Sequence, residues 1–518
     1  MNILSPLIRI SSMTMISRIL GFMRDILIAA SFGAGGIADA FFVAIKFPNL
    51  FRRVFAEGAL NVSFVPLFTK KISNPKSAKV FYHDIFNFLF WVLILIVAIF
   101  ELFMPLIIYI IAPGFIEDND KFLLVIDLAR IAFPYLFFIS LVSLLCGVLN
   151  SFEKFTLAAS LPIFVNLSMI IALLYIFNSE NYNTPNGSLI LMWSFMLSGF
   201  IQLLLCIYAC HKLDYAPKFR IPRLSNELKG FLTLSLPAVI AGGVTQINIL
   251  VGSIIASFED KAVSFLYYAD RVYQLPLALI GISIGIILLP QLTKKIKDPK
   301  SPQKEIIALQ NKSLELAMLL AIPATFGLIY ISHDVIKVLF ERYLFDSLAT
   351  LATGNVLMVF SLGLPAFVSV RVIQVSFFAR ENTKSPMSYA IVSVLLNILL
   401  SIILFNYIGY IGIAISTTIA SWANLILLYM GARRKNYFLI DKQIILKFFK
   451  IILASTFMII ILHIAYTHTI NLKYTYSGVV NFLILLFYVT LSIVSYSIIC
   501  EILNVFKFRD LYKMRSQK

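Results

Sequence analysis

The stretch SRILGFMRDILIA, residues 17–29, carries three charged side chains inside an apolar segment. Its leucine, isoleucine and phenylalanine residues are typical of the middle of a membrane-spanning helix, yet it contains Arg18, Arg24 and Asp25. On membrane-insertion scales, a charged side chain at the centre of a span costs about 2.5–3.5 kcal/mol. Three such side chains in one helix therefore indicate a function inside the membrane.

The composition of the chain agrees with a membrane location. Of its 518 residues 60% are hydrophobic and only 13% are charged, too few charges to cover a soluble protein of this size. Apolar runs of about 20 residues recur along the chain, which predicts an all-α polytopic membrane protein and not a barrel of alternating strands. The four cysteines lie in or beside apolar runs, so we expect buried thiols.

We expect about fourteen transmembrane helices. Their ranges are 7–32, 37–68, 84–113, 122–150, 157–178, 187–211, 228–258, 262–293, 305–332, 352–379, 386–407, 409–432, 446–467 and 476–504. The connecting segments alternate in charge: TKKISNPKSAK (69–79) and TKKIKDPKSPQK (293–304) are basic, whereas PGFIEDND (113–120) and NYIGYIG (406–412) lack Lys and Arg. By the positive-inside rule both termini are cytoplasmic. The net charge of +17 follows these loops, so we expect no nucleic-acid partner.

The sequence repeats itself at a nearly constant interval, which indicates an internal duplication. The matching pairs are VPLFTKKI (65–72) with LPQLTKKI (289–296), AASFG (29–33) with IASFE (255–259), and Pro134/Asn166 with Pro365/Asn397. They predict two pseudo-symmetric six-helix lobes, 1–215 and 225–435, and a further helix pair at 446–504. Lobes related in this way are typical of transporters with a central cavity between them. A duplication without transport remains open.

Charged residues on the first two spans form stripes, because residues three or four apart share a helix face. The cations Arg18, Arg24, Lys46, Arg52, Arg53 and Arg271 outnumber the acids Asp25, Asp39, Glu57 and Asp270. Surplus cations inside a membrane need water or an anionic ligand, and arginine binds phosphate in a two-pronged fork. The alternative is a purely structural network, for example with Asp39 paired to Lys46. We also expect Pro48 to kink the second span.

Three motifs make the chain similar to a known family. SSMTMISRILGFMRD (11–25), GAGGIADAFFVAIKFPNLFRRVFAEGA (33–59) and YYADRVYQLP (267–276) closely resemble the MurJ (MviN) family of lipid II flippases. This family belongs to the multidrug/oligosaccharidyl-lipid/polysaccharide (MOP) exporter superfamily. The resemblance implies translocation of undecaprenyl-diphosphate-MurNAc-pentapeptide-GlcNAc from the cytoplasmic to the periplasmic leaflet of the bacterial inner membrane. It also implies alternating access and a role in peptidoglycan synthesis and cell shape.

The resemblance further implies a substrate-binding central cavity in which Arg18, Arg24 and Arg271 hold the diphosphate. The candidate site residues are Arg18, Arg24, Asp25, Asp39, Lys46, Asn49, Arg52, Arg53, Glu57, Ser264 and Arg271. Gln274 departs from the family, many members of which carry an acid there. The helix pair 446–504 resembles the family's groove for the lipid tail. We expect a monomer with no catalytic residue, metal or cofactor, reset by a coupling ion or the membrane potential.

Other functions are weighed against this one. The nearest is a flippase of the same superfamily for O-antigen or capsule lipid-linked sugars, which shares the same substrate chemistry. A multidrug antiporter would need an acidic cavity and normally has about twelve spans. A membrane glycosyltransferase would need a catalytic loop at the outer face, and the sequence offers none. A scaffold without transport would not need charges inside the membrane.

Overall fold

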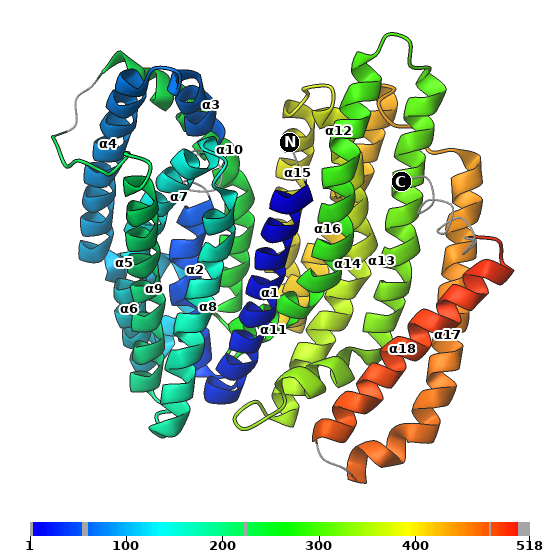
Figure 1. Ribbon diagram of the computed structural model, residues 1–518. Helices are drawn as coiled ribbons and strands as arrows, with labels where there is room; N and C mark the ends of the chain where they lie inside the picture. Colours follow the sequence, from blue (N-terminus) through cyan, green and yellow to red (C-terminus); the bar gives the residue numbers. More distant parts are fainter. Residues whose placement is uncertain (1–3, 54–60, 222–224, 476–477, 506–518) are drawn as a thin grey trace. The chain divides into compact units, whose positions relative to one another are not determined.

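The computed structural model describes residues 4–53, 61–221, 225–475 and 478–505 (Figure 1). Within these ranges the regular elements are helices and no strand occurs, which confirms the all-α prediction. The chain forms two compact units. The first unit comprises Met1–Ser264 with Arg342–Asp346, and the second comprises Phe265–Glu341 with Ser347–Lys518. Each unit is described by itself.

In the first unit α1 packs along α8, α2 along α6, and α7 against α9 and α3. The elements are α1 (Leu4–Phe32), α2 (Gly36–Phe51), α3 (Asn61–Lys71), α4 (Pro75–Leu102), α5 (Met104–Ile111), η2 (Pro113–Glu117), α6 (Asn119–Ala132), α7 (Tyr135–Ser151), α8 (Phe155–Asn178), α9 (Pro185–His211) and α10 (Asn226–Ala256). The α1–α8 contact brings the charged stretch of the first helix against a helix that lies much later in the chain.

In the second unit α14 packs against α13 and α16, α15 against α16, and the pair α17–α18 against α13. The elements are α11 (Ala262–Leu277), η3 (Ala278–Ile282), α12 (Ser283–Lys297), α13 (Gln303–Phe340), α14 (Ser347–Phe378), α15 (Lys384–Ile408), α16 (Tyr410–Arg434), α17 (Lys442–Thr475) and α18 (Gly478–Ile502). The first three residues of α11 belong to the first unit.

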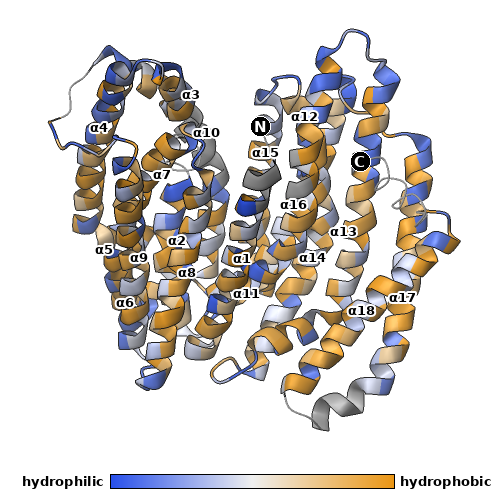
Figure 2. Ribbon diagram, in the orientation of Figure 1, coloured by the Kyte–Doolittle hydropathy of each residue, from blue (hydrophilic) through white to orange (hydrophobic). Residues whose placement is uncertain are grey.

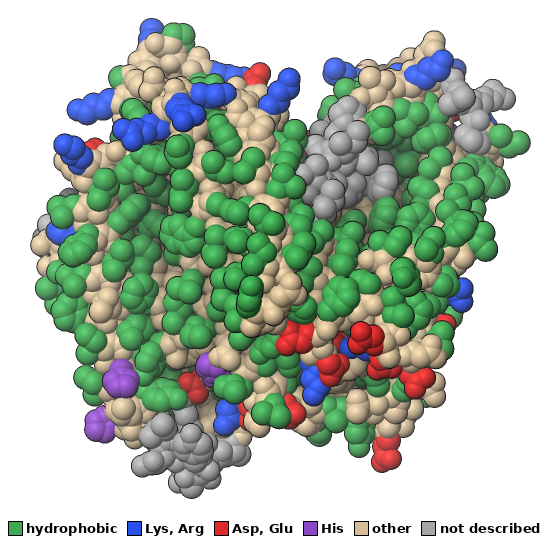
Figure 3. Space-filling view, turned by 180° about the vertical axis from the view of Figure 1, so that it is seen from behind, with side chains coloured by type: hydrophobic (Ala, Val, Ile, Leu, Met, Phe, Trp, Pro, Cys, Tyr) green, Lys and Arg blue, Asp and Glu red, His purple; other side chains and the backbone are tan. Residues whose placement is uncertain are grey.

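Ten of the described helical segments are long and apolar enough to cross a membrane, and Figure 2 shows their hydrophobic ribbons. Hydrophobic side chains also dominate the face in Figure 3, beneath an end where Lys and Arg gather. The other four expected spans fall on α1, on α2 with α3, on α10, and on α11 to α12. The chain is therefore a multi-pass membrane protein, and the described helices are consistent with the fourteen expected spans.

Two of those four spans contain a proline followed by a change in helical hydrogen bonding. Pro48 in α2 precedes a π-helical turn at residues 52–53, and Pro276 in α11 precedes the π-helical η3. Proline removes a backbone donor and crowds the preceding turn, so the hydrogen-bond ladder shifts beside it. The kink expected at Pro48 takes this form. The interval between the two prolines falls within the range set by the repeated segments of the sequence.

The ends of α9 and α16 also match. Asp214 and Asn436 each adopt the left-handed conformation, with φ of 65° and 54°. The next amide donates back to a carbonyl five residues earlier: Tyr215 N to Cys210 O at 2.9 Å, and Tyr437 N to Ala432 O at 2.8 Å. This is the hydrogen-bond pattern of a Schellman turn. The same turn also follows α7, α8, α14 and α18, so the duplication and the boundaries 1–215, 225–435 and 446–504 remain predictions.

Candidate functional site

The charged stretch of α1 is held by a residue of α8. Arg24 Nε and Nη2 donate to the same oxygen, Oδ1 of Asp25, at 3.0 and 2.7 Å. Arg24 Nη1 donates to Oδ1 of Asn166 at 3.1 Å, and Asn166 Nδ2 donates to the carbonyl of Ser17 at 2.9 Å. Gly21 lies beside Asn166, and a Cβ there would be 3.4 Å from Asn166 Nδ2, about van der Waals distance. Asn166 thereby fixes Arg24 against α1.

The charges on this part of α1 do not balance. The Arg24 side chain is 12% exposed and its partner Asp25 is buried, while Arg18 is exposed on the same helix. Between residues 17 and 29, two guanidinium groups therefore accompany one carboxylate. One positive charge on this stretch is therefore not balanced by a carboxylate of the same stretch, and an anionic ligand beside Arg24 and Arg18 would be attracted to it.

Asp39, in the first turn of α2, is fully buried and joins three parts of the first unit. Its Oδ1 accepts from the backbone N of Ser264 at 2.9 Å and from the Ser264 hydroxyl at 2.6 Å. Its Oδ2 accepts from the backbone N of Lys261 at 3.0 Å and from Lys121 Nζ at 2.9 Å. A carboxylate at the start of α11 satisfies backbone N–H groups that have no partner within the helix. Asp39 thus connects α2, α6 and the turn that precedes α11.

The expected pair of Asp39 with Lys46 is not formed, which corrects that part of the sequence analysis. Lys121 takes the place of Lys46, donates also to Asp260 at 3.2 Å, and lies 4.2 Å from the ring centroid of Phe115. The reason is direction: Asp39 and Lys46 are two turns apart on one helix, whereas the start of α6 packs directly beside α2.

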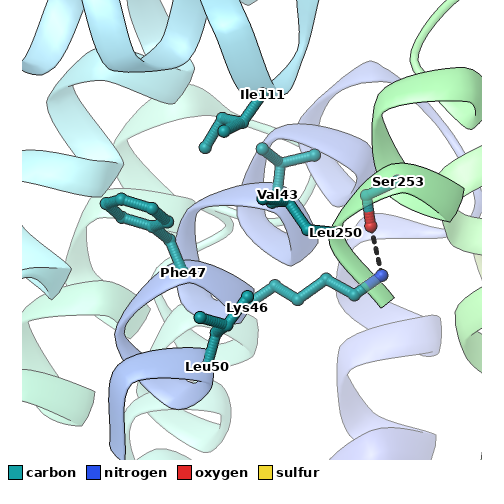
Figure 4. A pocket seen from close by; sticks show the side chains of 7 residues that line it. All are labelled: Val43, Lys46, Phe47, Leu50, Ile111, Leu250 and Ser253. Carbon is teal, nitrogen blue, oxygen red and sulfur yellow. Dashed lines mark hydrogen bonds between the residues drawn. The ribbon is translucent and has the colours of Figure 1, made fainter. Parts of the chain in front are cut away.

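Lys46 instead reaches from α2 to the hydroxyl of Ser253 on α10 (Figure 4). The two side chains line a small pocket between α2, α5 and α10. The other lining residues are Val43, Phe47, Leu50, Ile111 and Leu250. Lys46 therefore spans a mainly apolar pocket and ends at a neutral hydroxyl.

The remaining candidates on α2 lie near its end. Asn49 Nδ2 donates to the carbonyl of Ile45 at 2.9 Å, and Arg52 Nε donates to Oδ1 of Asn49 at 3.3 Å. Arg53 is exposed, and Glu57 lies outside the described residues. The structure thus places Asn49 as a positioning partner of Arg52.

Arg271 belongs to the second unit. Its Nη2 donates to the hydroxyl of Tyr267 at 2.7 Å, and the guanidinium carbon lies 4.8 Å from the centroid of the same ring. Gln274, which departs from the family, donates its amide to Asp270 one turn earlier. The grouping of Arg271 with Arg18 and Arg24 stays a prediction.

Comparison with known proteins gives the family. A family model described as lipid II flippase MurJ matches residues 28–489. The chain belongs to the MurJ family. It is 43% identical over 442 residues to the probable lipid II flippase MurJ of Rhizobium tropici, covering 84% of this chain and 82% of that protein. The corresponding protein of Rickettsia prowazekii is 38% identical over 468 residues, covering 90% of each chain.

Solved structures agree with this assignment. A lipid II flippase MurJ in an inward closed conformation aligns with a TM-score of 0.82 at 28% identity, covering 98% of this chain and all of that one. A multidrug resistance MATE family transporter of the MOP superfamily aligns with a TM-score of 0.64 at 15% identity, which shows a shared fold. This MurJ chain is therefore a member of a transporter family and a multi-pass inner-membrane protein.

Sequence reasoning missed two partners of the MurJ site. Asn166 was noted only as a repeat marker, although a polar amide in an apolar run was already a signal for a buried polar contact. Lys121 follows directly after the acidic segment 113–120, which was noted only for its lack of Lys and Arg. Both act through contacts between helices distant in sequence, which the periodicity of a single helix does not reveal.

Proposed function

We propose that this MurJ protein translocates lipid II from the cytoplasmic to the outer leaflet of the inner membrane. The observation that carries the proposal is Arg24, a largely buried guanidinium on a helix where cations outnumber carboxylates. Lipid II offers a diphosphate, which needs such a partner, and a polyprenyl tail that can remain in the bilayer. We expect both termini to be cytoplasmic and the protein to act as a monomer.

In this mechanism Asp25 and Asn166 orient Arg24, and the substrate completes its coordination. A guanidinium has five N–H donors, and Asp25 and Asn166 use only some of those of Arg24. Nη1 also lies 3.9 Å from Met169 Sδ, so the donor left for a phosphate oxygen is the second N–H of Nη2. Arg18 and Arg271 add charge to the same diphosphate when the two lobes enclose it.

Transport requires that the substrate bind the alternating states differently. The proposed drive is the membrane potential, worth about 2.3 kcal/mol per charge per 100 mV, or a coupling ion that resets the cations after release. Breaking the four hydrogen bonds of Asp39 is the proposed step that opens the outer end of α2.

The test is complementation of a host depleted of its own lipid II flippase. This chain is expected to restore growth and the exposure of lipid II at the outer leaflet, measured by digestion of the exposed headgroup. Complementation of a second host, which lacks its O-antigen flippase, distinguishes lipid II transport from the nearest alternative function. Rescue of that host alone would assign the chain to O-antigen or capsule precursors.

Cysteine labelling tests the proposed orientation. Cysteines placed at Gly35 or Asn183 are expected to react with an impermeant maleimide in intact cells, and those at Ser77 or Ser301 only after permeabilisation, because the basic loops stay inside. The native background suits the measurement, since Cys146, Cys206, Cys210 and Cys500 are free and buried, as expected. Reversed labelling would invert the direction of transport.

A further inference from the structure

A segment between α9 and α10, residues 212–221 and here called the strap, lies along α4. Asn87 of α4 binds its backbone twice: Nδ2 donates to the carbonyl of Lys218 at 2.9 Å, and Oδ1 accepts from the backbone N of Arg220 at 2.6 Å. Trp91 Nε1 donates to the carbonyl of Arg220 at 3.2 Å. The ring of Phe219 lies 5.0 Å from that of Phe90. The strap is therefore fixed on the helix surface.

The other end of the strap is held by charge. Asp214 forms an ion pair with Lys79 of α4, and this hydrogen bond holds the pKa of the Asp214 carboxyl below its usual value. Tyr215 is buried and packs against Phe68 and Phe152. Both ends of the strap are thus attached to the first unit.

The position of the strap along α4 corresponds to the edge of the bilayer. The apolar run of α4 begins after Asp84, so Asn87 and Trp91 lie about 5 and 10 Å into it at 1.5 Å per residue. Tryptophan is enriched at this headgroup level, and interfacial segments bury their apolar side chains to a similar depth. The contacts with Asn87 and Trp91 therefore hold the strap where lipid headgroups meet acyl chains.

The strap exposes cations and apolar groups in alternation. Phe219 is 66% and Ile221 83% exposed, and Lys218 and Arg220 also reach the surface. An aqueous environment would leave two large apolar side chains in water. An interface with anionic headgroups satisfies both kinds of side chain, with the apolar pair among acyl chains and the cations at phosphate level.

The second unit contains the equivalent linker, and there the apolar side chain is less exposed. Asn311 of α13 follows Asn87 at the interval that separates LPQLTKKI from VPLFTKKI, and it donates to the carbonyl of Leu439 at 2.9 Å in the linker between α16 and α17. Ile440, which follows this carbonyl as Phe219 follows that of Lys218, is half-buried. The helix α13 also packs against α17 and α18, whereas α4 packs among the described elements against α3, α5, α7 and α10. Among the described residues, Phe219 therefore has less protein cover than its counterpart in the second unit.

We propose that the strap is a docking site for an anionic glycerophospholipid of the bilayer, with Lys218 and Arg220 at its phosphate and Phe219 and Ile221 among its acyl chains. The occupant follows from charge complementarity, from the depth along α4 and from the less exposed counterpart in the second unit. The proposal is independent of which substrate the MurJ protein translocates.

Trp91 serves as the probe, because it touches the strap. The full-length protein with Trp193→Phe and Trp422→Phe keeps one of its three tryptophans. It is reconstituted into phosphatidylcholine vesicles containing, at equal mole fractions, either brominated phosphatidylglycerol or brominated phosphatidylcholine. We expect brominated phosphatidylglycerol to quench Trp91 more strongly, with a preference of about fivefold for each strap cation.

In the double variant Lys218→Ser, Arg220→Ser, we expect the two brominated lipids to quench Trp91 fluorescence equally. The matched control is Arg433→Ser, Arg434→Ser, which removes two exposed cations at the end of α16 and should keep the preference. Equal quenching in the parent protein overturns the proposal. So does a preference that survives the strap variant or is lost equally in the control. The vesicles contain no lipid II, so none of these outcomes depends on transport.

Discussion

Replacing Arg24 with alanine is expected to abolish growth support in the flippase-depleted host. Loss of a hydrogen-bonded charged contact to phosphate removes about 3 kcal/mol, roughly a hundredfold in binding. The measurement is plating efficiency together with outer-leaflet exposure of lipid II. Arg271→Ala is expected to give the same result, because it removes a cation that the site is predicted to share.

A matched set of variants separates substrate binding from folding. Arg24→Ala leaves the buried Asp25 without its cation, so Arg24→Ala, Asp25→Asn removes that charge as well. Arg434→Ala, an exposed arginine at the end of α16, is expected to behave as the parent protein. If the Arg24→Ala, Asp25→Asn protein reaches normal membrane levels and supports growth, Arg24 does not hold the diphosphate.

The second large effect is expected at Lys121. Its side chain is 8% exposed and pairs with the fully buried Asp39. Lys121→Met leaves a buried carboxylate without a cation, at a cost of about 3–5 kcal/mol. The expected result is a marked fall in the thermal unfolding temperature of the purified protein, followed by intrinsic fluorescence.

Double variants test whether the partner is Lys121 or Lys46. Asp39→Asn with Lys121→Met removes both charges of a contacting pair, so most of the stability is expected to return although transport does not. For Asp39→Asn with Lys46→Met, we expect the loss of stability to equal the sum of the losses in the two single variants. The reason is that Lys46 binds the neutral hydroxyl of Ser253 and not Asp39. Recovery in the Lys46 combination, and none in the Lys121 combination, would contradict the pairing seen in the structure.

Apolar runs and loop charge were sufficient to predict the helical architecture, because membrane insertion depends on local sequence. The prolines were informative for the same reason: Pro48 lies just before a π-helical turn. The partners of the charged residues could not be predicted in this way. Lys46 had the right charge and helix for Asp39, yet the start of α6 brings Lys121 closer.

The internal repeat held more information than we used. Asn87 and Asn311 are separated by the same interval as the VPLFTKKI and LPQLTKKI segments, so aligning the two halves pairs them. Both asparagines bind the backbone of the linker after the sixth membrane span of their half, and this contact is seen only in the structure. The sequence shows that the two positions are equivalent. The atoms that the two side chains bind depend on the path of each linker in the folded protein.

The two hydrogen bonds of Asn87 also limit the free length of the linker between α9 and α10. Between His211 at the end of α9 and Asn226 at the start of α10, an unattached chain could extend to about 50 Å at 3.3–3.6 Å per residue. With Arg220 fixed to α4, only the six links from Arg220 to Asn226 remain, a reach of about 20 Å. While Asn87 holds, the start of α10 can travel no farther than this from its anchor. The amide of Asn87 thus limits how far the start of α10 can move away from α4.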